Sequence, residues 1–562
     1  MRSRPRGKAA PGVTLLVTAL MAILAPGPAA GRDTSETRDQ PRRTFPLIAT
    51  IRIDRGDVFD LSNPDERHLP YIWANRLHFE TREYVIRREL LFEEGDPADP
   101  DVLYESERNL RRLDFLHDNS RIETVPRDDG RVDVVVHTRD IWTTKPSASI
   151  NRAGNETTGR FSFVEENLFG FGKRLGLSLK KELDRDSGGI EYFDPRVLGS
   201  RWTLGTSYFD RSDGILYAVD ADRPFFSVLT ERAGGGGGSH FSQVSTLQID
   251  GDDAPGFRQR HSDLQLHYGR ALRTGYEGVR RLVCRFQLVN DRFDVEPGEG
   301  PLSPLPPLGG AGYVSLPENR RFRVLEAEYQ SSGVNFERVS FLDKFDRFQD
   351  INLGDDWAAS LGVSPQFLGD DHNHIFFSSR YGRWFHFSPA SYSLVEGSTS
   401  GRFLSGVGRN VTSEFDFRHY YLGFSRQTLV FHASHSWGHN LDGDKQFLLG
   451  GDTGLRGYDN RRFDGNKRLL LNVEDRAYMV FDWLHLLSVA FSAFADSGYV
   501  WRTGESEDLG DLVGDVGIGF RFDVTRGSSG TVIRLDYAYP LNAVGRADNP
   551  RGLLSFTAGQ AF

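Results

Sequence analysis

The stretch from Gly450 to Arg476 reads GGDTGLRGYDNRRFDGNKRLLLNVEDR, and it decides the fold. The part before Arg468 holds five glycines among alternating charges, which is the composition of a loop. From Arg468 onward polar and apolar residues alternate with a period of two, which predicts a half-buried strand. A glycine-rich loop therefore runs directly into a strand. One arginine of this loop, Arg456, stands just before Gly457 and Tyr458.

The same alternation continues through residues 145–562, where no convincing amphipathic helix interrupts it. In one late segment Ile518 and Phe520 face away from Arg521 and Asp523. A soluble barrel would turn the charged face outward, whereas an outer-membrane barrel turns it into the lumen. After the N-terminus no run of about 18 apolar residues occurs, and the mean hydropathy is −0.45, so membrane-spanning helices are excluded.

Two features of this region favour the membrane barrel. Short connectors alternate with long ones, as periplasmic turns alternate with surface loops. The last residues alternate and end on an aromatic, which resembles the C-terminal strand signal of outer-membrane proteins, carried here by Phe556, Gly559 and Phe562. Counting strands back from Phe562 puts the loop of Arg456 outside the cell, and the C-terminus and the N-terminal region in the periplasm.

Residues 1–30 have the pattern of a secretory signal peptide. Four basic residues precede the apolar stretch Val13–Ala25, whose 13 residues are too few to span a bilayer. Residues 31–46 are charged and poor in apolar residues, which predicts a flexible leader. The lone cysteine, Cys284, cannot form an intramolecular disulfide. The net charge of −10 gives no bulk attraction to nucleic acid.

Residues 47–140 predict a small α+β domain. The expected order is a strand at Leu47–Ile53, helices at Thr81–Phe92 and from Pro100 onward, and strands at Arg121–Val125 and Arg131–Thr138. This order resembles a polypeptide-transport-associated (POTRA) domain. The insertion at residues 54–80 departs from that resemblance, and its binding partner is not readable from the sequence.

Strand parity gives Arg456 two candidate partners. Glu474 faces the lumen from the strand that follows the loop, and Asp496 faces the lumen from the next strand. An arginine on the intervening loop could reach both, and charge-assisted bonds of this kind contribute about 1.5 to 3 kcal/mol each. The alternative is that Arg456 is a solvated loop charge like its neighbour Arg461. Carboxylates in a barrel lumen are common, and no base or nucleophile accompanies these two.

Two motifs resemble those of the BamA/TamA-like outer-membrane assembly and two-partner-secretion superfamily. Leu455 to Tyr458 looks like the arginine-glycine-aromatic motif of its sixth surface loop. The segment from Phe494 to Gly498 looks like its phenylalanine-x-aspartate-x-glycine strand motif, which implies Asp496 as the partner of Arg456. The resemblance implies a mainly β protein: a C-terminal transmembrane antiparallel β-barrel of sixteen strands, preceded by one small POTRA-like domain. The residues alone suggest a somewhat higher strand count.

The resemblance also implies a function. It predicts an outer-membrane insertase or translocase that handles unfolded outer-membrane or secreted client polypeptides, with its POTRA domain in the periplasm and a barrel seam that opens sideways. Arg456, Gly457, Tyr458, Glu474 and Asp496 would form a lock in the lumen. Outer-membrane lipid and periplasmic or lipoprotein partners are further candidates, and no nucleic acid or cofactor is expected.

Other functions remain as alternatives or are disfavoured. A passive outer-membrane channel and a lipid-related transporter of the same fold stay open. No persuasive Ser/His pair supports a lipase, so no enzyme activity is expected. His435 and His439 would lie about 13 Å apart along a strand, too far for one metal ion. The run Gly234–Gly238 lacks the lysine of a phosphate-binding loop and is expected to be a surface loop.

Overall fold

The computed structural model describes residues 45–558, apart from residues 154–155, 183, 255, 297–315 and 527–531. The chain divides into two compact units, Met1–Pro46 and Leu47–Phe562, and the second holds every named element. The predicted signal peptide and nearly all of the predicted leader lie outside the described residues, as do Gly559 and Phe562. In the described part of the chain, none of the helices has both the length and the apolar character needed to cross a membrane.

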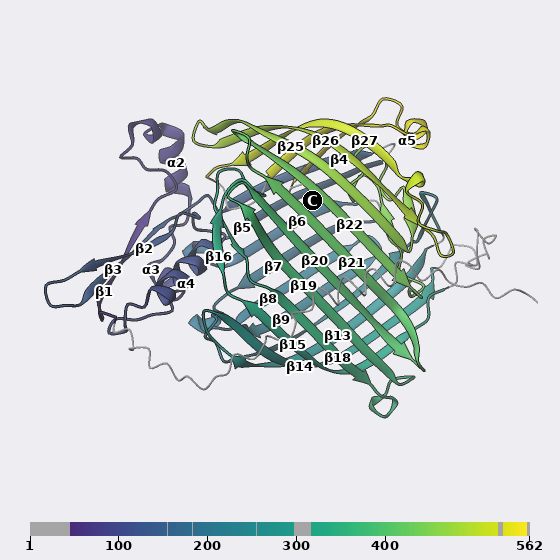
Figure 1. Ribbon diagram of the computed structural model, residues 1–562, viewed down its shortest axis with the longest axis horizontal. Coiled ribbons are helices and arrows are strands. Elements are labelled where there is room, and N and C mark those ends of the chain that lie inside the picture. The colour runs from purple at the N-terminus through teal and green to yellow at the C-terminus, as the bar shows by residue number, and fades with distance from the viewer. Residues whose placement is uncertain are drawn as a thin grey trace, which may run out of the picture. The chain divides into compact units, whose positions relative to one another are not determined.

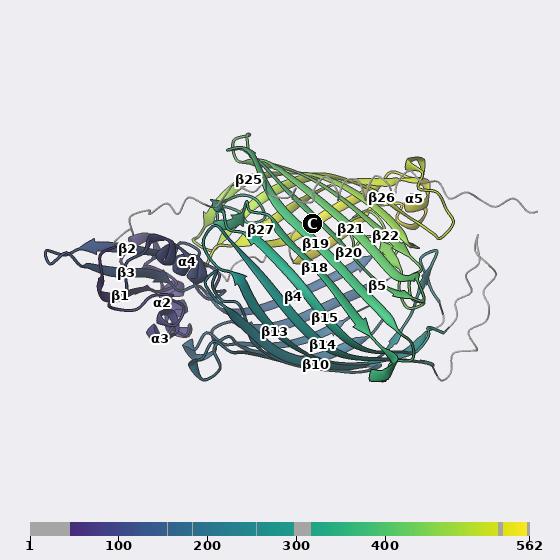
Figure 2. The ribbon, with the colours of Figure 1, turned by 60° about the horizontal axis from the view of Figure 1, so that its bottom comes forward.

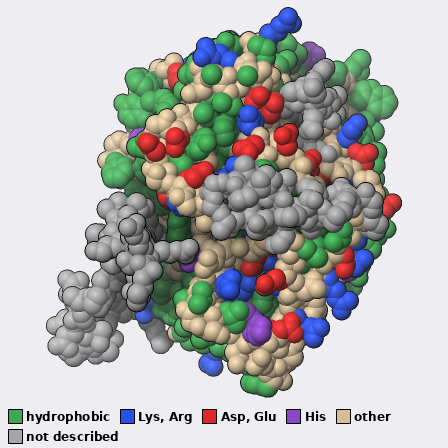
Figure 3. Space-filling view, turned by 90° about the vertical axis from the view of Figure 1, so that its right-hand side faces the viewer, with side chains coloured by type: hydrophobic (Ala, Val, Ile, Leu, Met, Phe, Trp, Pro, Cys, Tyr) green, Lys and Arg blue, Asp and Glu red, His purple; other side chains and the backbone are tan. Residues whose placement is uncertain are grey.

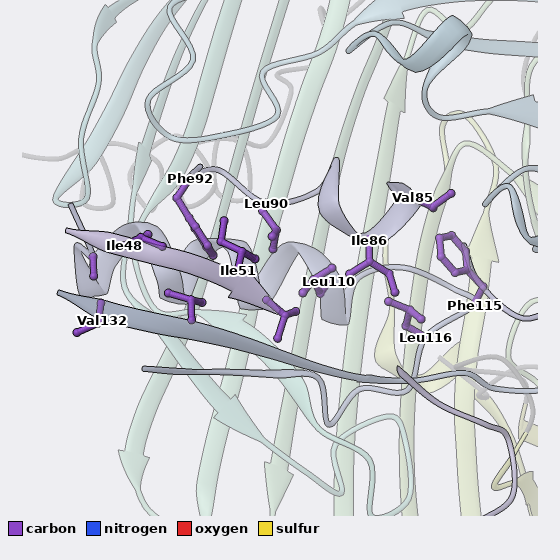
Figure 4. Packing of buried hydrophobic residues seen from close by; sticks show 13 residues of the cluster. Ile48, Ile51, Val85, Ile86, Leu90, Phe92, Leu110, Phe115, Leu116 and Val132 are labelled. Atoms are coloured by element: carbon purple, nitrogen blue, oxygen red, sulfur yellow. The ribbon is translucent and has the colours of Figure 1, made fainter. Parts of the chain in front are cut away.

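An α+β module follows Pro46. Its sheet has the order β1-β3-β2, in which β1 (Ile48–Gly56) is parallel to β3 (Val132–Arg139) and β2 (Arg121–Pro126) is antiparallel to it. Figure 4 shows the core between this sheet and the helices, where Ile86 and Leu110 are fully buried. Helix α4 (Pro100–Arg111) begins at a capping Asp99, with proline at its first position.

The helical part of the module differs from the expectation. The helix predicted at Thr81–Phe92 is only α3 (Glu83–Arg87). Tertiary contacts take up the flanking backbone, because the Thr81 N–H donates to the carboxylate of Asp140 and the Leu91 N–H donates to the hydroxyl of Ser106. The insertion at residues 54–80 contains a helix that the sequence analysis did not expect, α2 (Leu69–Leu77).

Among the described residues, twenty strands close into one barrel, so the count of sixteen expected from the resemblance is wrong. Figures 1 and 2 show the barrel from two sides. Neighbours along the chain pair antiparallel, and the last strand, β29, stands beside the first, β4. The barrel strands are β4 (Thr144–Ala153), β5 (Glu156–Glu165), β6 (Arg174–Lys181), β7 (Asp186–Asp194), β8 (Thr203–Arg211), β9 (Gly214–Arg223), β10 (Arg232–Ser245), β13 (Phe257–Arg273), β14 (Gly278–Val295), β15 (Arg320–Gly333), β18 (Asp356–Ser364), β19 (His374–Ser388), β20 (Ser391–Leu404), β21 (Val407–Tyr421), β22 (Gln427–His439), β25 (Lys467–Trp483), β26 (Leu487–Trp501), β27 (Val513–Val524), β28 (Val532–Pro540) and β29 (Leu553–Ala558).

The glycine run Gly234–Gly238 lies inside β10, so the expectation of a surface loop is wrong. Neighbouring side chains cover the backbone here. A Cβ built on Gly235 would lie 2.1 Å from a carboxylate oxygen of Asp222, and one built on Gly236 would lie 2.6 Å from the side chain of Leu266. Glycine in a strand often marks such a close approach.

The strand faces follow the expected alternation. Along β27 and β28, Arg521 and Asp536 are buried toward the lumen, whereas Ile518 and Tyr537 are exposed on the outer wall. An apolar outer wall and a polar interior are the pattern of an outer-membrane barrel.

The longest connectors lie mainly at one end of the barrel, although tight turns such as residues 212–213 and 405–406 also lie there. Long connectors, among them residues 440–466 and 502–512, lie at the end away from the module. Figure 3 looks onto that end, where basic and acidic side chains are interspersed among apolar ones. Connectors at the module's end are mostly short, with one exception at residues 334–355. This segment, named the inner hairpin here, contains the paired strands β16 (Phe336–Val339) and β17 (Gln349–Asn352).

Candidate functional site

The loop that carries Arg456 folds back onto the barrel wall. It joins β22 to β25 and contains a short ladder of β23 (Phe447–Leu449) and β24 (Phe463–Gly465). Leu455 and Tyr458, on either side of the arginine and glycine, are both fully buried. They pack with hydrophobic residues of the ladder and of β25, β26 and β27, so apolar burial holds the tip of the loop in place.

Arg456 is buried between two strands. Its Nε and Nη2 donate to the two carboxylate oxygens of Asp496 at 2.7 and 2.8 Å, and its Nη1 donates to Glu474 at 2.7 Å. The guanidinium carbon lies 3.4 Å from the centre of the Phe494 ring. This forked geometry on a carboxylate is one that arginine satisfies and lysine cannot. The structure thus brings together the three charged residues that strand parity had paired.

Glu474 is the centre of a larger network. Besides Arg456, it accepts hydrogen bonds from Arg476 on its own strand, at 3.0 Å, and from Arg521 on β27, at 3.1 and 3.3 Å. Arg521 also donates to Asp536 on β28. The network therefore spans four consecutive strands, β25 to β28, and the inward loop.

The sequence analysis did not assign Arg476, Arg521 and Asp536 to the site. Their position on the charged face of each strand was readable, and that alternation was the signal that could have found them. Their height in the lumen was not readable, because it depends on how neighbouring strands are staggered.

The remaining motif residues shape the backbone around the network. The Gly457 N–H donates to Asp515 at 3.0 Å, and a Cβ on this glycine would lie 2.6 Å from the Cβ of Asp515. The Tyr458 hydroxyl donates to the carbonyl of Gly514 at 3.0 Å. At Gly498 a Cβ would lie 2.6 Å from the carbonyl oxygen of Leu469. Both glycines therefore stand where a side chain would not fit without movement.

Of the predicted C-terminal strand signal, Phe556 is described and lies in β29, opposite Leu535 of β28. Gly559 and Phe562 remain predictions, because they lie beyond the described residues.

The inner hairpin occupies the lumen at the module's end. Its Leu342 is fully buried among lumen-facing side chains, which include Tyr392 and Tyr420 from β20 and β21. Its Phe345 is buried against Tyr478 of β25. Because these partners come from separate strands of the wall, the hairpin lies inside the barrel.

Polar contacts connect the inner hairpin to the rest of the molecule on both sides, and one from each side matters here. Arg476, which holds Glu474, also donates to the carbonyl of Leu342 at 2.9 Å. On the other side, the Phe348 N–H donates to Asp118 of the module at 2.6 Å. Burial alone would raise the pKa of Asp118, but this bond and the neighbouring His117 outweigh it and hold the pKa below its usual value.

The histidines of β22 do not converge. His432 bonds to Asn472 and Asp416, whereas His435 bonds to Glu507. Within the described residues, no group of three or more His, Cys, Asp or Glu side chains has the arrangement of a metal site.

The loop, β25 and β26 fall within a region shared with known proteins. Residues 307–562 match the Omp85 superfamily domain. Over 134 residues the chain is 31% identical to the outer membrane protein assembly factor BamA of Neorickettsia risticii (strain Illinois), a match that spans 23% of this chain and 18% of that protein.

Solved structures with a similar chain trace include BamA from Haemophilus ducreyi lacking POTRA domains 1–3. It has 12% identity and a TM-score of 0.36, and the match covers 92% of this chain and 84% of that one. CdiB from Acinetobacter baumannii has 12% identity, a TM-score of 0.43, and coverage of 92% and 74%. CdiB from Escherichia coli has 13% identity, a TM-score of 0.42, and coverage of 89% and 73%. The match to the Omp85 superfamily domain therefore covers the strands and the loop that build the lumen network.

Proposed function

We propose that this protein assembles or exports client polypeptides at the bacterial outer membrane, with its α+β module in the periplasm as a POTRA domain. The observation that carries the proposal is the buried network around Glu474. It fastens β25 to β28 to one another and to the inward loop, and it stops one strand short of β29. The wall beside the seam is therefore held by buried charges, whereas no residue of the network lies on the described part of β29, Leu553–Ala558.

The seam between β29 and β4 is suited to open. The described part of β29 has six residues, and it pairs with β28 from Leu553 to Ala558. Because the Arg456 network lies on the other side of β28, the seam could part without breaking it. This is the role that we propose for the lumen lock.

The module offers a strand edge for a client. In the order β1-β3-β2 the strand β2 pairs on one side only, and most of its residues are exposed. An extended client segment could add to this edge by β-augmentation, which depends on backbone hydrogen bonds and tolerates many sequences. The driving force would be the folding and burial of the client itself, and no catalysis is involved.

A second candidate is a passive channel, and one observation favours it. A cavity of about 560 Å³ is lined by charged and polar residues of the barrel strands, among them Arg380, Glu414 and Arg468. The inner hairpin argues against it, since the hairpin fills part of the lumen at the module's end.

The test is site-specific photocross-linking in the native cell. A photoreactive residue at Glu123 on β2 should capture newly made outer-membrane or secreted polypeptides, whereas one at the exposed Asp101 of α4 should capture far less. The set of polypeptides captured at Glu123 should change when Arg456 is replaced by alanine. If Glu123 captures no polypeptide, while the purified protein conducts ions steadily in a planar bilayer without any client, the proposal is wrong and the channel is favoured.

A further inference from the structure

The insertion at residues 54–80 builds a small hydrophobic core that includes a residue next to the barrel. The ring of Tyr71 on α2 stacks on Phe59, with 4.5 Å between the ring centroids. Val58 is buried with these two rings, and Trp142 packs against the cluster. Trp142 stands two residues before β4. The core of the insertion therefore holds the segment that leads directly into the first barrel strand.

Glu66, at the end of the short helix η1 (Pro64–Glu66) in this insertion, is a buried carboxylate between two arginines. Arg526 donates to one carboxylate oxygen at 2.9 Å, and Arg139 donates to the other at 3.2 Å. The Glu66 and Arg526 side chains are 5% and 12% exposed. Burial and the nearby Arg526 lower the pKa of Arg139, and Glu66 opposes them. Without Glu66, two neighbouring cations would be left with no carboxylate between them.

The two arginines belong to opposite sides of the seam between β29 and β4. Arg139 ends β3, from which the chain runs through Trp142 into β4. Arg526 lies in the connector between β27 and β28, and β29 follows β28 in the sheet. The Trp142 N–H also donates to the carbonyl of Arg526 at 2.7 Å. These contacts therefore bridge β28, β29 and the seam at the module's end of the barrel.

A further contact joins the insertion to the same part of the wall. The Tyr71 hydroxyl donates to the carbonyl of Leu484, in the turn between β25 and β26. The insertion is thus bonded to two connectors of the strands β25 to β28, which the network around Glu474 fastens together. At the module's end, β4 therefore cannot move away from that block without breaking the contacts to Arg526.

We propose that the insertion is a clasp that holds the seam closed at the module's end, with Glu66 as the residue that fastens it. That the seam opens during function rests on the proposed function, whereas the bridge itself does not. Opening would break the pair of Glu66 with Arg526 and the hydrogen bond from Trp142 to Arg526. The seam would then part from this end only when the insertion releases Arg526.

The clasp is tested by a distance across the seam, in the full chain in phospholipid nanodiscs and without a client. With Cys284 replaced by serine, spin labels at Phe163→Cys on β5 and Ile533→Cys on β28 stand on the two sides of β4 and β29. Pulsed electron paramagnetic resonance measures the distance between them. We expect Glu66→Gln to add a population whose labels lie at least one strand spacing, about 5 Å, further apart. The neutral amide keeps the size of the side chain but cannot pair with both arginines.

The matched control is Glu80→Gln in the same insertion. Glu80 pairs with Arg55 inside the module at 3.1 Å, so its loss should leave the distance unchanged. Arg526→Gln changes the barrel side of the clasp and should lengthen the distance as Glu66→Gln does.

Three outcomes would overturn the clasp. One is an unchanged distance in Glu66→Gln, and another is an equal change in Glu80→Gln. The third is a change in Glu66→Gln that Arg526→Gln does not reproduce, because it would come from the folding of the insertion itself. Since no client takes part, a failed clasp leaves the cross-linking test at Glu123 untouched, and failure of that test leaves this distance unaffected.

Discussion

At the scale of single residues, the lumen network is built around a buried cation, Arg456. Arg456 neutralises Asp496 through two parallel bonds and shares Glu474 with Arg476 and Arg521. If Arg456 is lost, the amide of Asn472 remains beside Asp496, but the forked cation does not. Removing one partner from a buried ion pair costs about 3 to 5 kcal/mol, because the other charge stays buried.

We therefore expect Arg456→Ala to lower the temperature at which the barrel loses its heat-modifiable gel mobility. Arg456→Lys should give an intermediate loss, since an ammonium cannot make both bonds to Asp496. Asp496→Asn combined with Arg456→Ala should cost less than the sum of the single changes. The matched control is Arg461→Ala in the same loop, whose partner Asp184 is partly exposed and whose loss should cost at most about 1 kcal/mol. Equal shifts for Arg456 and Arg461 would refute the lock.

The sequence predicted part of this site for a physical reason. A period of two assigns every side chain of a strand to a face, and the loop between two strands must end near both of them, so Arg456, Glu474 and Asp496 could be paired. Arg521 and Asp536 could not be assigned in this way. They lie on strands beyond β26, and only the stagger of the closed sheet brings them to the height of Glu474.

At the scale of elements, the inner hairpin is the feature that the sequence did not predict. Its apolar residues would be expected equally in a small two-stranded hairpin at the surface. The sequence does not show that they are buried, because the tyrosines that pack against them lie on strands far along the chain. Its ends meet closely. The Gly333 N–H donates to the carbonyl of Asp355 at 2.7 Å, and a Cβ on Gly354 would lie 2.5 Å from the carbonyl carbon of Gly333. The hairpin is thus an insertion into what would otherwise be a tight turn.

This geometry allows a clean deletion. Removing residues 335–352 leaves a four-residue turn between β15 and β18, made of Val334, Leu353, Gly354 and Asp355, and a turn of this length suits an antiparallel hairpin. We expect the barrel to form and its conductance in a planar bilayer to rise several-fold. Shortening the connector at residues 502–512, at the other end of the barrel, is the control and should change conductance little. Unchanged conductance after the inner deletion would show that the hairpin does not obstruct the lumen.

At the scale of the whole molecule, the sequence predicted a barrel but not its size. Residues 145–562 alternate throughout, and this gave the architecture. The count of sixteen came from the resemblance, whereas the residues alone suggested a somewhat higher number, and the alternation did not identify every strand. The glycines of β10 have no side chains to alternate, so a central part of the wall was read as a loop. Pairing with β9 and β13 makes it a strand, and such pairing is a property of the closed sheet rather than of the segment.

The whole molecule is also connected from the module to the outer loop. Arg111 of α4 forms two bonds, at 3.0 and 2.8 Å, to Asp350 of the inner hairpin, and both side chains are nearly buried. The hairpin in turn accepts a bond from Arg476, which holds Glu474. A contiguous chain of contacts therefore runs from the module to Arg456. Contiguity alone does not establish coupling, so the contact at Asp350 needs a direct measurement.

We expect Asp350→Asn and Arg111→Gln each to speed hydrogen exchange of residues 336–352 in the full chain. Arg111→Gln leaves the nearly buried Asp350 without its cation, and Asp350→Asn frees the hairpin from Arg111, which then keeps only its pair with Glu107. The double variant should exchange about as fast as the faster single one, since the two side chains act as one contact. Arg87→Gln, which removes an exposed pair with Glu83 on α3, should leave this exchange unchanged. Additive effects of the two changes would mean that the module does not hold the hairpin through this pair. A hairpin released by either single change would mean that docking of the module helps to keep the lumen closed.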